Sequence, residues 1–229
     1  MQAKTKLLEI KDETHDVKSF RFEKPARFDY KPGQYVLLAD ASGERAFSLA
    51  SSPTEDFLQI SIKMTGSPFK ESLLSLLGQH VEISGPFGRF ILDEGKTQNA
   101  DTRVMVAGGI GITPFRSMIK YATDKKLGDK IILIYSNKTA EDIAFLGELT
   151  EIQKQNENLA IVHTLTRSDS SDYRTGRIDE KLIREIIDNI GGSIFYACGP
   201  PAFVDTVIVI LKSMGVDAGN IRFERFTGY

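Results

Sequence analysis

The chain has 229 residues, enough for one large domain or two small ones, each with its own core. Hydrophobic residues make up 41% and charged residues 26%, as in ordinary globular proteins, and the formal net charge of -2 excludes a general attraction to nucleic-acid phosphates. The single cysteine excludes an internal disulfide and any all-cysteine metal or iron–sulfur site.

The two ends of the chain bear on where the protein works. The first eleven residues alternate charged and apolar side chains and lack the apolar core of a signal peptide. The longest apolar run near the end, residues 207–211, is far too short to span a bilayer. The sequence therefore predicts a cytoplasmic protein with no membrane span and no nucleic-acid partner.

The first part of the chain has the pattern of β-strands. Residues 58–63 alternate apolar and polar side chains with period 2, which predicts a half-buried strand, and residues 20–22 and 81–83 repeat the alternation. One short helix is expected at 70–77, ended by Gly78. Several short strands with frequent Gly and Pro turns predict a small antiparallel β-barrel.

The second part alternates strand and helix. Strand-like runs lie at 103–107, 130–135, 159–165, 193–197 and 221–226, and helical stretches at 114–125, 140–156, 179–190 and 201–214. Asp179 is expected to cap the third helix and Gly191-Gly192 to end it. The fold class is therefore a two-domain protein, with residues 98–229 forming an α/β doubly wound parallel sheet after a barrel of residues 1–97.

A glycine-rich loop follows the first strand of the second part, with the sequence Gly108-Gly109-Ile110-Gly111-Ile112-Thr113-Pro114. Small residues let backbone amides approach a pyrophosphate at a helix N-terminus, where the helix dipole favours an anion. Thr113 is expected to be the N-cap, and Pro114 suits the first helical position because it needs no N–H donor there. The alternative is a tight strand-to-helix turn without a ligand.

A second loop, Cys198-Gly199-Pro200-Pro201, also lies between a strand and a helix. Ligands of doubly wound sheets bind at the carboxyl ends of strands, so the two loops are expected to face one pocket. A lone buried cysteine is otherwise a small hydrophobic residue. The histidines, His15, His80 and His163, are scattered along the chain and predict neither a metal site nor a catalytic triad.

These two loops together resemble those of the ferredoxin–NADP reductase superfamily, over essentially the whole chain. The resemblance implies a flavin-binding barrel followed by an NAD(P)-binding domain. It also implies that Gly108, Gly109, Gly111, Thr113 and Pro114 cradle the nicotinamide dinucleotide, and that Cys198, with Gly199 and Pro200, lies beside the nicotinamide ring.

The family's flavin signature, Arg-x-Tyr-Ser, is matched by Arg45-Ala46-Phe47-Ser48. By this resemblance Phe47 stacks on the isoalloxazine ring, Ser48 hydrogen-bonds near its reactive nitrogen, and Arg45 pairs with the diphosphate. Phenylalanine in place of tyrosine keeps the stacking face but loses a hydroxyl. The alternative is a plain amphipathic strand.

A second flavin segment is implied further along the barrel, where a helix start and its amides would hold the pyrophosphate. Its residues are Ile62, Lys63, Gly66, Lys70, Glu71 and Ser72. Lys63 could equally be solvated. At the end of the chain, Glu224 and Phe226 match the acidic and aromatic residues that the family places near the flavin and nicotinamide, with Tyr229 as a competing aromatic or the tail having no function.

The implied reaction is hydride transfer from NADH or NADPH to bound FAD, with FMN as the alternative flavin, and then electron transfer to a protein or small-molecule acceptor. Ser48, Cys198 and Glu224 are the expected catalytic residues, and no metal is expected. Ser136, Asn137, Lys138 and Arg167 are expected to bind the nucleotide. Lys138 and Arg167 would hold a 2′-phosphate if NADPH is used, and the alternative is that both are simply solvated. The alternatives are a reductase of free flavin, an electron-transfer subunit of a larger complex, and a nucleotide-binding module without flavin.

Overall fold

The computed structural model describes residues 1–40, 43–92, 102–168 and 172–227. By their contacts these residues form two compact units, Met1–Leu92 with Thr113–Lys125, and residues 102–112 with 126–227. The expected boundary between residues 97 and 98 lies outside the described residues.

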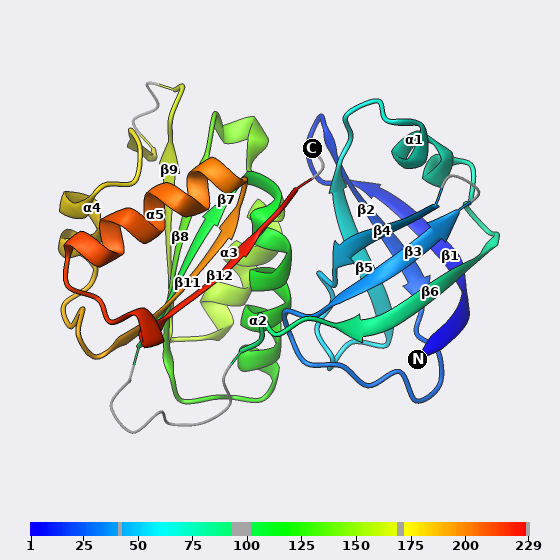
Figure 1. Cartoon of the computed structure of the whole chain (residues 1–229), viewed down its shortest axis with the longest axis horizontal. Coiled ribbons are helices and arrows are strands. Elements are labelled where there is room, and N and C mark those ends of the chain that lie inside the picture. Colours follow the sequence, from blue (N-terminus) through cyan, green and yellow to red (C-terminus); the bar gives the residue numbers. More distant parts are fainter. Residues whose placement is uncertain (41–42, 93–101, 169–171, 228–229) are drawn as a thin grey trace. The chain divides into compact units, whose positions relative to one another are not determined.

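Six antiparallel strands form the sheet of the first unit, in the order β4-β3-β6-β1-β2-β5 (Figure 1). They are β1 (Gln2–Asp12), β2 (Val17–Glu23), β3 (Tyr35–Asp40), β4 (Gly43–Ser48), β5 (Phe57–Lys63) and β6 (His80–Phe87). An antiparallel bridge between Leu49 and Ile60 joins the two edges of the sheet. The sheet therefore closes into a barrel, which confirms the prediction.

Strand β5 is buried on both faces, so the prediction of a half-buried strand was wrong. Its polar residues Gln59 and Ser61 are only 1% and 6% exposed. Ser61 Oγ lies 2.7 Å from Ser19 Oγ, and Gln59 Nε2 donates to Ser19 Oγ at 3.2 Å. Hydrogen bonds within the protein replace water on this face, and alternation of polar and apolar residues does not distinguish the two cases.

Two helices belong to the first unit. Helix α1 (Pro68–Leu74) begins after Ser67, whose side chain accepts a hydrogen bond from the Lys70 amide, and its C-cap is Ser75 rather than Gly78. Gly78 has φ +78° and donates to the Leu7 carbonyl, so it turns the chain toward β6 instead of ending the helix. Helix α2 (Thr113–Asp124) buries Phe115, Met118, Ile119 and Ala122, and Arg116 and Ser117 are buried as well.

The second unit contains a six-stranded parallel sheet in the order β10-β9-β8-β7-β11-β12 (Figure 1). Its strands are β7 (Thr102–Gly108), β8 (Lys130–Asn137), β9 (Leu159–Leu165), β10 (Arg174–Thr175), β11 (Ser193–Gly199) and β12 (Ile221–Arg225). The five predicted strands and the doubly wound topology are confirmed. Strand β10 was not predicted because two residues are too few to show a periodic pattern.

The strands of this sheet are linked by helices and short 3₁₀ turns. These are η1 (Gly109–Ile112), η2 (Ala140–Asp142), α3 (Leu146–Gln155), α4 (Glu180–Ile186), α5 (Pro201–Ser213) and η3 (Ala218–Asn220). Helices α4 and α5 cover one face of the sheet (Figure 1), and their residues Ile183 and Leu211 belong to one buried cluster with Val106 of β7. Asp179 caps α4 as predicted, by accepting a hydrogen bond from the Leu182 amide.

The prediction that Gly191-Gly192 ends α4 was wrong. The helix stops at Ile186, because Ile187 has an extended backbone and is buried at 3% exposure. Burial of that side chain in the core therefore ends the helix before the glycines are reached.

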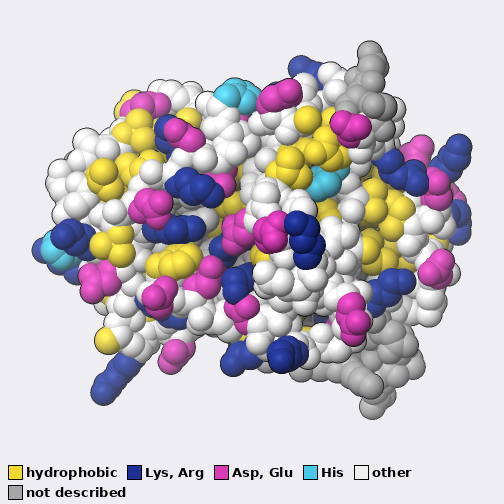
Figure 2. Space-filling model, turned by 180° about the vertical axis from the view of Figure 1, so that it is seen from behind, with side chains coloured by type: hydrophobic (Ala, Val, Ile, Leu, Met, Phe, Trp, Pro, Cys, Tyr) yellow, Lys and Arg dark blue, Asp and Glu magenta, His cyan; other side chains and the backbone are white. Residues whose placement is uncertain are grey.

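The surface carries charges of both signs. On the face shown in Figure 2, Lys and Arg side chains are interspersed with Asp and Glu, as the net charge of -2 suggests. Among the described helices, none combines the length and the apolar character that a membrane crossing requires.

Candidate functional site

All strands of this sheet are parallel, but the order in which they are added across the sheet changes side between β7 and β11. Strand β7 is followed in space by β8 and β9 on one side and by β11 and β12 on the other. In doubly wound sheets a ligand binds at this switch point, outside the carboxyl ends of the strands. The loops that leave β7 and β11 there are the two predicted from the sequence, Gly108–Ile112 and Cys198–Pro200.

Glycines hold these two loops in backbone contact. A Cβ on Gly111 would lie 2.3 Å from the Cys198 carbonyl oxygen, and one on Gly199 would lie 3.0 Å from the Gly108 carbonyl oxygen. Gly199 also has φ +154°. No larger residue fits at Gly111 without moving the loops apart, so the glycines are required by the close approach.

Gly109 differs from its neighbours because its backbone faces open space. It has φ +53°, and a Cβ built on it would meet no atom of the described residues within 4 Å. Open space above a glycine-rich turn at the switch point is the shape that a pyrophosphate needs to reach backbone amides. The residues present therefore fit a dinucleotide.

The prediction that Thr113 is an N-cap was wrong. The 3₁₀ turn Gly109–Ile112 leads directly into α2, and Thr113 is already the first residue of the helix, at 1% exposure. Pro114, consequently, is the second residue of α2. The start of helical backbone is nearer to the end of β7 than the sequence indicated.

Cys198 lies beside Glu224 on neighbouring strands. The register pairs Cys198 of β11 with Glu224 of β12 and with Ala107 of β7. The Phe226 amide donates to the Gly199 carbonyl at 2.9 Å, which fixes the chain after β12 against the same loop. Burial raises the pKa of the fully buried Cys198 thiol well above its usual value, and the charge of Glu224 raises it further. Cys198 is therefore a neutral thiol at neutral pH.

The predicted nucleotide-specificity residues gather at the ends of β8 and β9. Ser136 pairs with Gly108 in the sheet, which places it next to the glycine loop. The Arg167 amide donates to the Lys138 carbonyl at 2.8 Å, and both residues are exposed. Asn137 is 6% exposed, and neither polar atom of its side chain makes a hydrogen bond of good geometry within the described residues. A buried amide of this kind is a group that a bound ligand could satisfy.

In the barrel, the flavin signature occupies strand β4. Arg45 and Ala46 are exposed, Phe47 is half-buried, and Ser48 is 7% exposed. The rings of Phe47 and Phe69 stack with centroids 5.9 Å apart, and the Arg45 guanidinium lies 5.5 Å from the Phe69 centroid. Phe69 is the second residue of α1 and is only 4% exposed, so it belongs to the barrel core and backs the half-buried Phe47 ring and the exposed Arg45 of β4. Phe69 was not predicted, because only its place next to β4 in the fold gives it this role.

The residues of the second flavin segment lie in different environments. Ile62 is in the barrel core, Gly66 and Glu71 are exposed, and Ser72 donates to the Phe69 carbonyl at 2.8 Å. Lys70 is 9% exposed, and its ammonium donates to the Lys63 carbonyl at 2.9 Å and to Thr65 Oγ1 at 3.1 Å. Burial lowers the pKa of Lys70, and the nearby Lys63 lowers it further.

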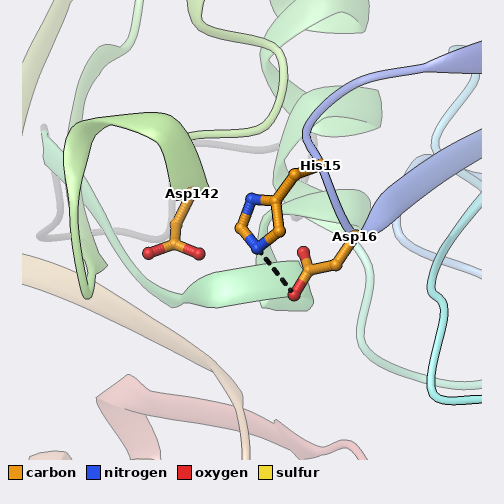
Figure 3. A group of neighbouring side chains, drawn as sticks. All are labelled: His15, Asp16 and Asp142. Atoms are coloured by element: carbon orange, nitrogen blue, oxygen red, sulfur yellow. Dashed lines mark ion pairs between the residues drawn. The ribbon is translucent and has the colours of Figure 1, made fainter.

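Lys63 forms an ion pair with Asp16, which also pairs with His15 (Figure 3). The distance from His15 Nε2 to Asp16 Oδ2 is 3.5 Å. Burial alone would raise the pKa of Asp16, but Lys63, His15 and the hydrogen bond with Thr14 together outweigh it and lower the pKa below its usual value. The Lys63 charge is thus partly neutralised on the barrel surface.

Comparisons with known proteins match the first and second parts of the chain to two different kinds of domain. Residues 2–113 match an FAD-binding domain, and residues 105–208 match an oxidoreductase NAD-binding domain. The reductase component of propane 2-monooxygenase from Mycolicibacterium goodii is 27% identical over 98% of this chain and 67% of its own length. The gamma subunit of sulfhydrogenase 2 from Pyrococcus furiosus is 30% identical over 94% of this chain and 80% of its own.

Solved structures show the same architecture. An Amycolatopsis cytochrome P450 reductase superposes with a TM-score of 0.88 at 25% identity, over 99% of this chain and 71% of that one. A ferredoxin NADP+ reductase from Neisseria gonorrhoeae superposes with a TM-score of 0.85 at 20% identity, over 98% of both chains, which shows the fold alone.

A closed barrel that matches an FAD-binding domain, followed by a doubly wound sheet that matches an NAD-binding domain, defines a flavin-dependent NAD(P)H oxidoreductase. The chain belongs to the ferredoxin–NADP reductase superfamily, as the expected resemblance implied.

Proposed function

We propose that the chain transfers a hydride from NADH or NADPH to bound FAD and passes the electrons to a separate acceptor. The observation that carries this proposal is the backbone contact of Gly111 with the Cys198 carbonyl, beside the open face of Gly109. It supplies a cradle for the dinucleotide at the switch point of the sheet. The FAD-binding match of the barrel supplies the second cofactor.

Each cofactor would be held by a separate group of residues. Arg45, Phe47 and Ser48 would hold the flavin on β4, with the buried Phe69 packed behind the Phe47 ring. Gly108, Gly109 and Gly111 would hold the pyrophosphate of the nicotinamide dinucleotide, and Cys198, Glu224 and Phe226 would line the space for its nicotinamide ring. Bound FAD would supply the redox chemistry, since it accepts a hydride and can release electrons to an acceptor. The protein contributes orientation and exclusion of water.

The electron acceptor would be another molecule. The sequence has one cysteine, which cannot supply the four ligands of an all-cysteine iron–sulfur cluster. Several relatives are reductase or electron-transfer components of oxygenases, but the chain spans only 51% to 80% of the length of the relatives, so this assignment is a proposal. An oxygenase component is the acceptor that these relatives support. We also propose a cytoplasmic location, where a free thiol stays reduced.

The visible spectrum of the purified protein tests this function. A bound flavin should bleach when NADH or NADPH is added without oxygen. Ser48→Ala should slow the bleaching by at least about tenfold while the Kd for NAD⁺ stays unchanged, because only the flavin side loses a hydrogen bond. Ser213→Ala, at the exposed end of α5, is the matched control. A colourless protein that oxidises neither nucleotide, even with added flavin, would contradict the proposal.

We further propose that Lys138 and Arg167 select NADPH. Two exposed cations, joined through a backbone hydrogen bond and next to the buried Asn137 amide, suit a 2′-phosphate. Lys138→Ala should lower kcat/KM for NADPH by about tenfold or more and leave kcat/KM for NADH within about twofold, as expected for the loss of one phosphate contact. Equal effects on both nucleotides would contradict this assignment. Lys154→Ala, an exposed lysine at the end of α3, is the control.

A second candidate is an electron-transfer subunit of a larger complex. The sulfhydrogenase gamma subunit, of which this chain covers 80%, favours it. A reductase of free flavin is the third candidate. Gel filtration separates these two, because a subunit with its own cofactor retains flavin on the column, whereas a free-flavin reductase elutes without it.

A further inference from the structure

A buried ion pair joins helix α2 to the segment that follows strand β4. Arg116 is 1% exposed, and its guanidinium donates both to the Glu55 carboxylate, with Nη2 to Oε1 at 2.9 Å, and to the Ala50 carbonyl at 2.9 Å. Two parallel hydrogen bonds between a planar guanidinium and a carboxylate fix orientation as well as distance. The pair thus allows α2 little rotation or sliding against this segment.

The segment that receives Arg116 is itself firmly held. Ser51 is fully buried, and its carbonyl accepts hydrogen bonds from Ser117 Oγ at 2.5 Å and from the Tyr30 hydroxyl at 3.0 Å. The Ala50 amide donates to the Gln59 carbonyl at 2.7 Å, and Glu55 Oε2 accepts from the Ser52 amide at 2.6 Å. Both ends of the contact are therefore rigid.

The position of the pair along the chain is informative. Arg116 comes four residues after Ile112, the last residue of the glycine loop, and Ala50 comes two residues after Ser48 of the flavin signature. The contact thus connects the flanks of the two predicted cofactor segments. A buried ion pair is also often no more stabilising than apolar residues of the same volume, so geometry is a better reason for it than stability.

We propose that Arg116 and Glu55 are positioning residues for hydride transfer. They hold the helix after the nucleotide loop in a fixed register against the segment after the flavin strand, and neither residue touches a cofactor. This inference rests on the proposed function.

Variants of the pair test the proposal in the full chain. Glu55→Gln keeps the side-chain shape but removes the charge, and Arg116→Met removes the guanidinium and its two parallel hydrogen-bond donors. The rate constant for flavin reduction at saturating nucleotide should fall by about tenfold to a hundredfold, because small misplacements of reacting groups cost rates of this order. Flavin content and the Kd for NAD⁺ should stay within about twofold, as expected when only the positioning of the reacting groups changes. Amide hydrogen exchange at residues 110–115 should become about tenfold faster, because the local opening free energy falls.

Lys120→Gln, a change of the same charge on the same helix, is the control and should change none of these values. The double variant should be no slower than Arg116→Met alone, because both changes remove one interaction. If Arg116→Met does not fold, the rate constant for flavin reduction in Glu55→Gln alone tests the proposal. An unchanged reduction rate in Glu55→Gln, or a fall that follows loss of flavin, overturns the inference. A wild-type protein whose bound flavin is not reduced contradicts the proposed function itself.

Discussion

Single atoms decide how closely the two loops of the nucleotide site approach each other. The hydrogen of Gly111 lies where a methyl group would be 2.3 Å from the Cys198 carbonyl oxygen. Gly111→Ala should therefore push the loops apart, weaken NAD⁺ binding by at least about tenfold and destabilise the fold by about 1–3 kcal/mol. Calorimetric titration with NAD⁺ and denaturant unfolding would measure the two effects.

Gly147→Ala is the matched control for this change. Gly147 lies in α3, and a Cβ there would meet no described atom within 4 Å. The Gly147→Ala variant should bind NAD⁺ normally, and its free energy of unfolding should rise by up to about 1 kcal/mol, because alanine restricts the unfolded chain and favours a helix. Equal behaviour of the two variants would contradict the close-approach argument.

The buried thiol of Cys198 predicts a pH dependence of stability. An unfolded cysteine ionises near pH 8.5, about the value of a free thiol. The folded pKa is raised, so above that pH the unfolded state loses a proton that the folded state keeps. The contribution of the thiol to the free energy of unfolding should then fall as pH rises, by up to about 1.4 kcal/mol per pH unit, and be flat below about pH 8.

Urea unfolding between about pH 7 and pH 10 would measure this slope, and Cys198→Ala should lack it. Burial also raises the pKa of Tyr30 and Tyr135, so their contribution begins near the usual tyrosine pKa of about 10 and is common to both proteins. The difference between the two proteins isolates the thiol. Identical slopes would show that Cys198 ionises normally in the fold.

Among the elements, α4 depends on its cap. Asp179 accepts the Leu182 amide at 2.8 Å at the start of a helix of only seven residues. Asp179→Ala should lower the free energy of unfolding by about 1 kcal/mol. Asp188→Ala should change it by less than about 0.5 kcal/mol, since the Asp188 side chain is 92% exposed and its ion pair with Lys130 is 3.8 Å long. A thermal or denaturant melt of both variants compares them.

The elements also show which features a sequence can predict. Runs of β-branched residues and glycine turns were enough for the barrel, for five parallel strands and for the two loops at the switch point. They did not predict that β5 is buried on both faces. The sequence pattern of polar residues that hydrogen-bond to one another inside the protein is the same as that of polar residues exposed to water. The 3₁₀ turn Gly109–Ile112 before α2 was also missed, since a 3₁₀ turn has no capping signature of its own.

The site was predictable only where a motif is contiguous. The Arg45–Ser48 signature and the glycine loop are short runs, and the structure shows where each run lies. Phe69 joins Phe47 and Arg45 only through the fold, and Arg116 lies next to Glu55 only because two segments 61 residues apart meet. Contacts between distant segments leave no local pattern to read.

For the whole molecule, flavin binding should appear as added stability. A ligand that binds only the folded state at 100 times its Kd stabilises it by about 2.7 kcal/mol. FAD should therefore raise the melting temperature of flavin-free protein by several degrees. Riboflavin, which lacks the pyrophosphate, should raise it less, if Arg45 contributes a phosphate contact as proposed.

Arg45→Gln separates these contributions. It should reduce the shift caused by FAD and leave the shift caused by riboflavin unchanged. Arg184→Gln, an exposed arginine on α4, is the control for a lost charge and should leave both shifts unchanged. Equal shifts by FAD and riboflavin in the wild type would contradict a pyrophosphate site at Arg45.

Helix α2 follows the nucleotide loop in sequence, yet its contacts group it with the barrel. The two halves of the chain are therefore not interchangeable modules. A natural recombination or a designed chimera that joins this barrel to the second half of a relative must also bring an arginine at the position of Arg116, or replace Glu55. Otherwise a carboxylate that is 12% exposed would lose its cation, at a cost of about 3–5 kcal/mol. Successful exchanges should cross over after residue 125, where α2 stays with its barrel.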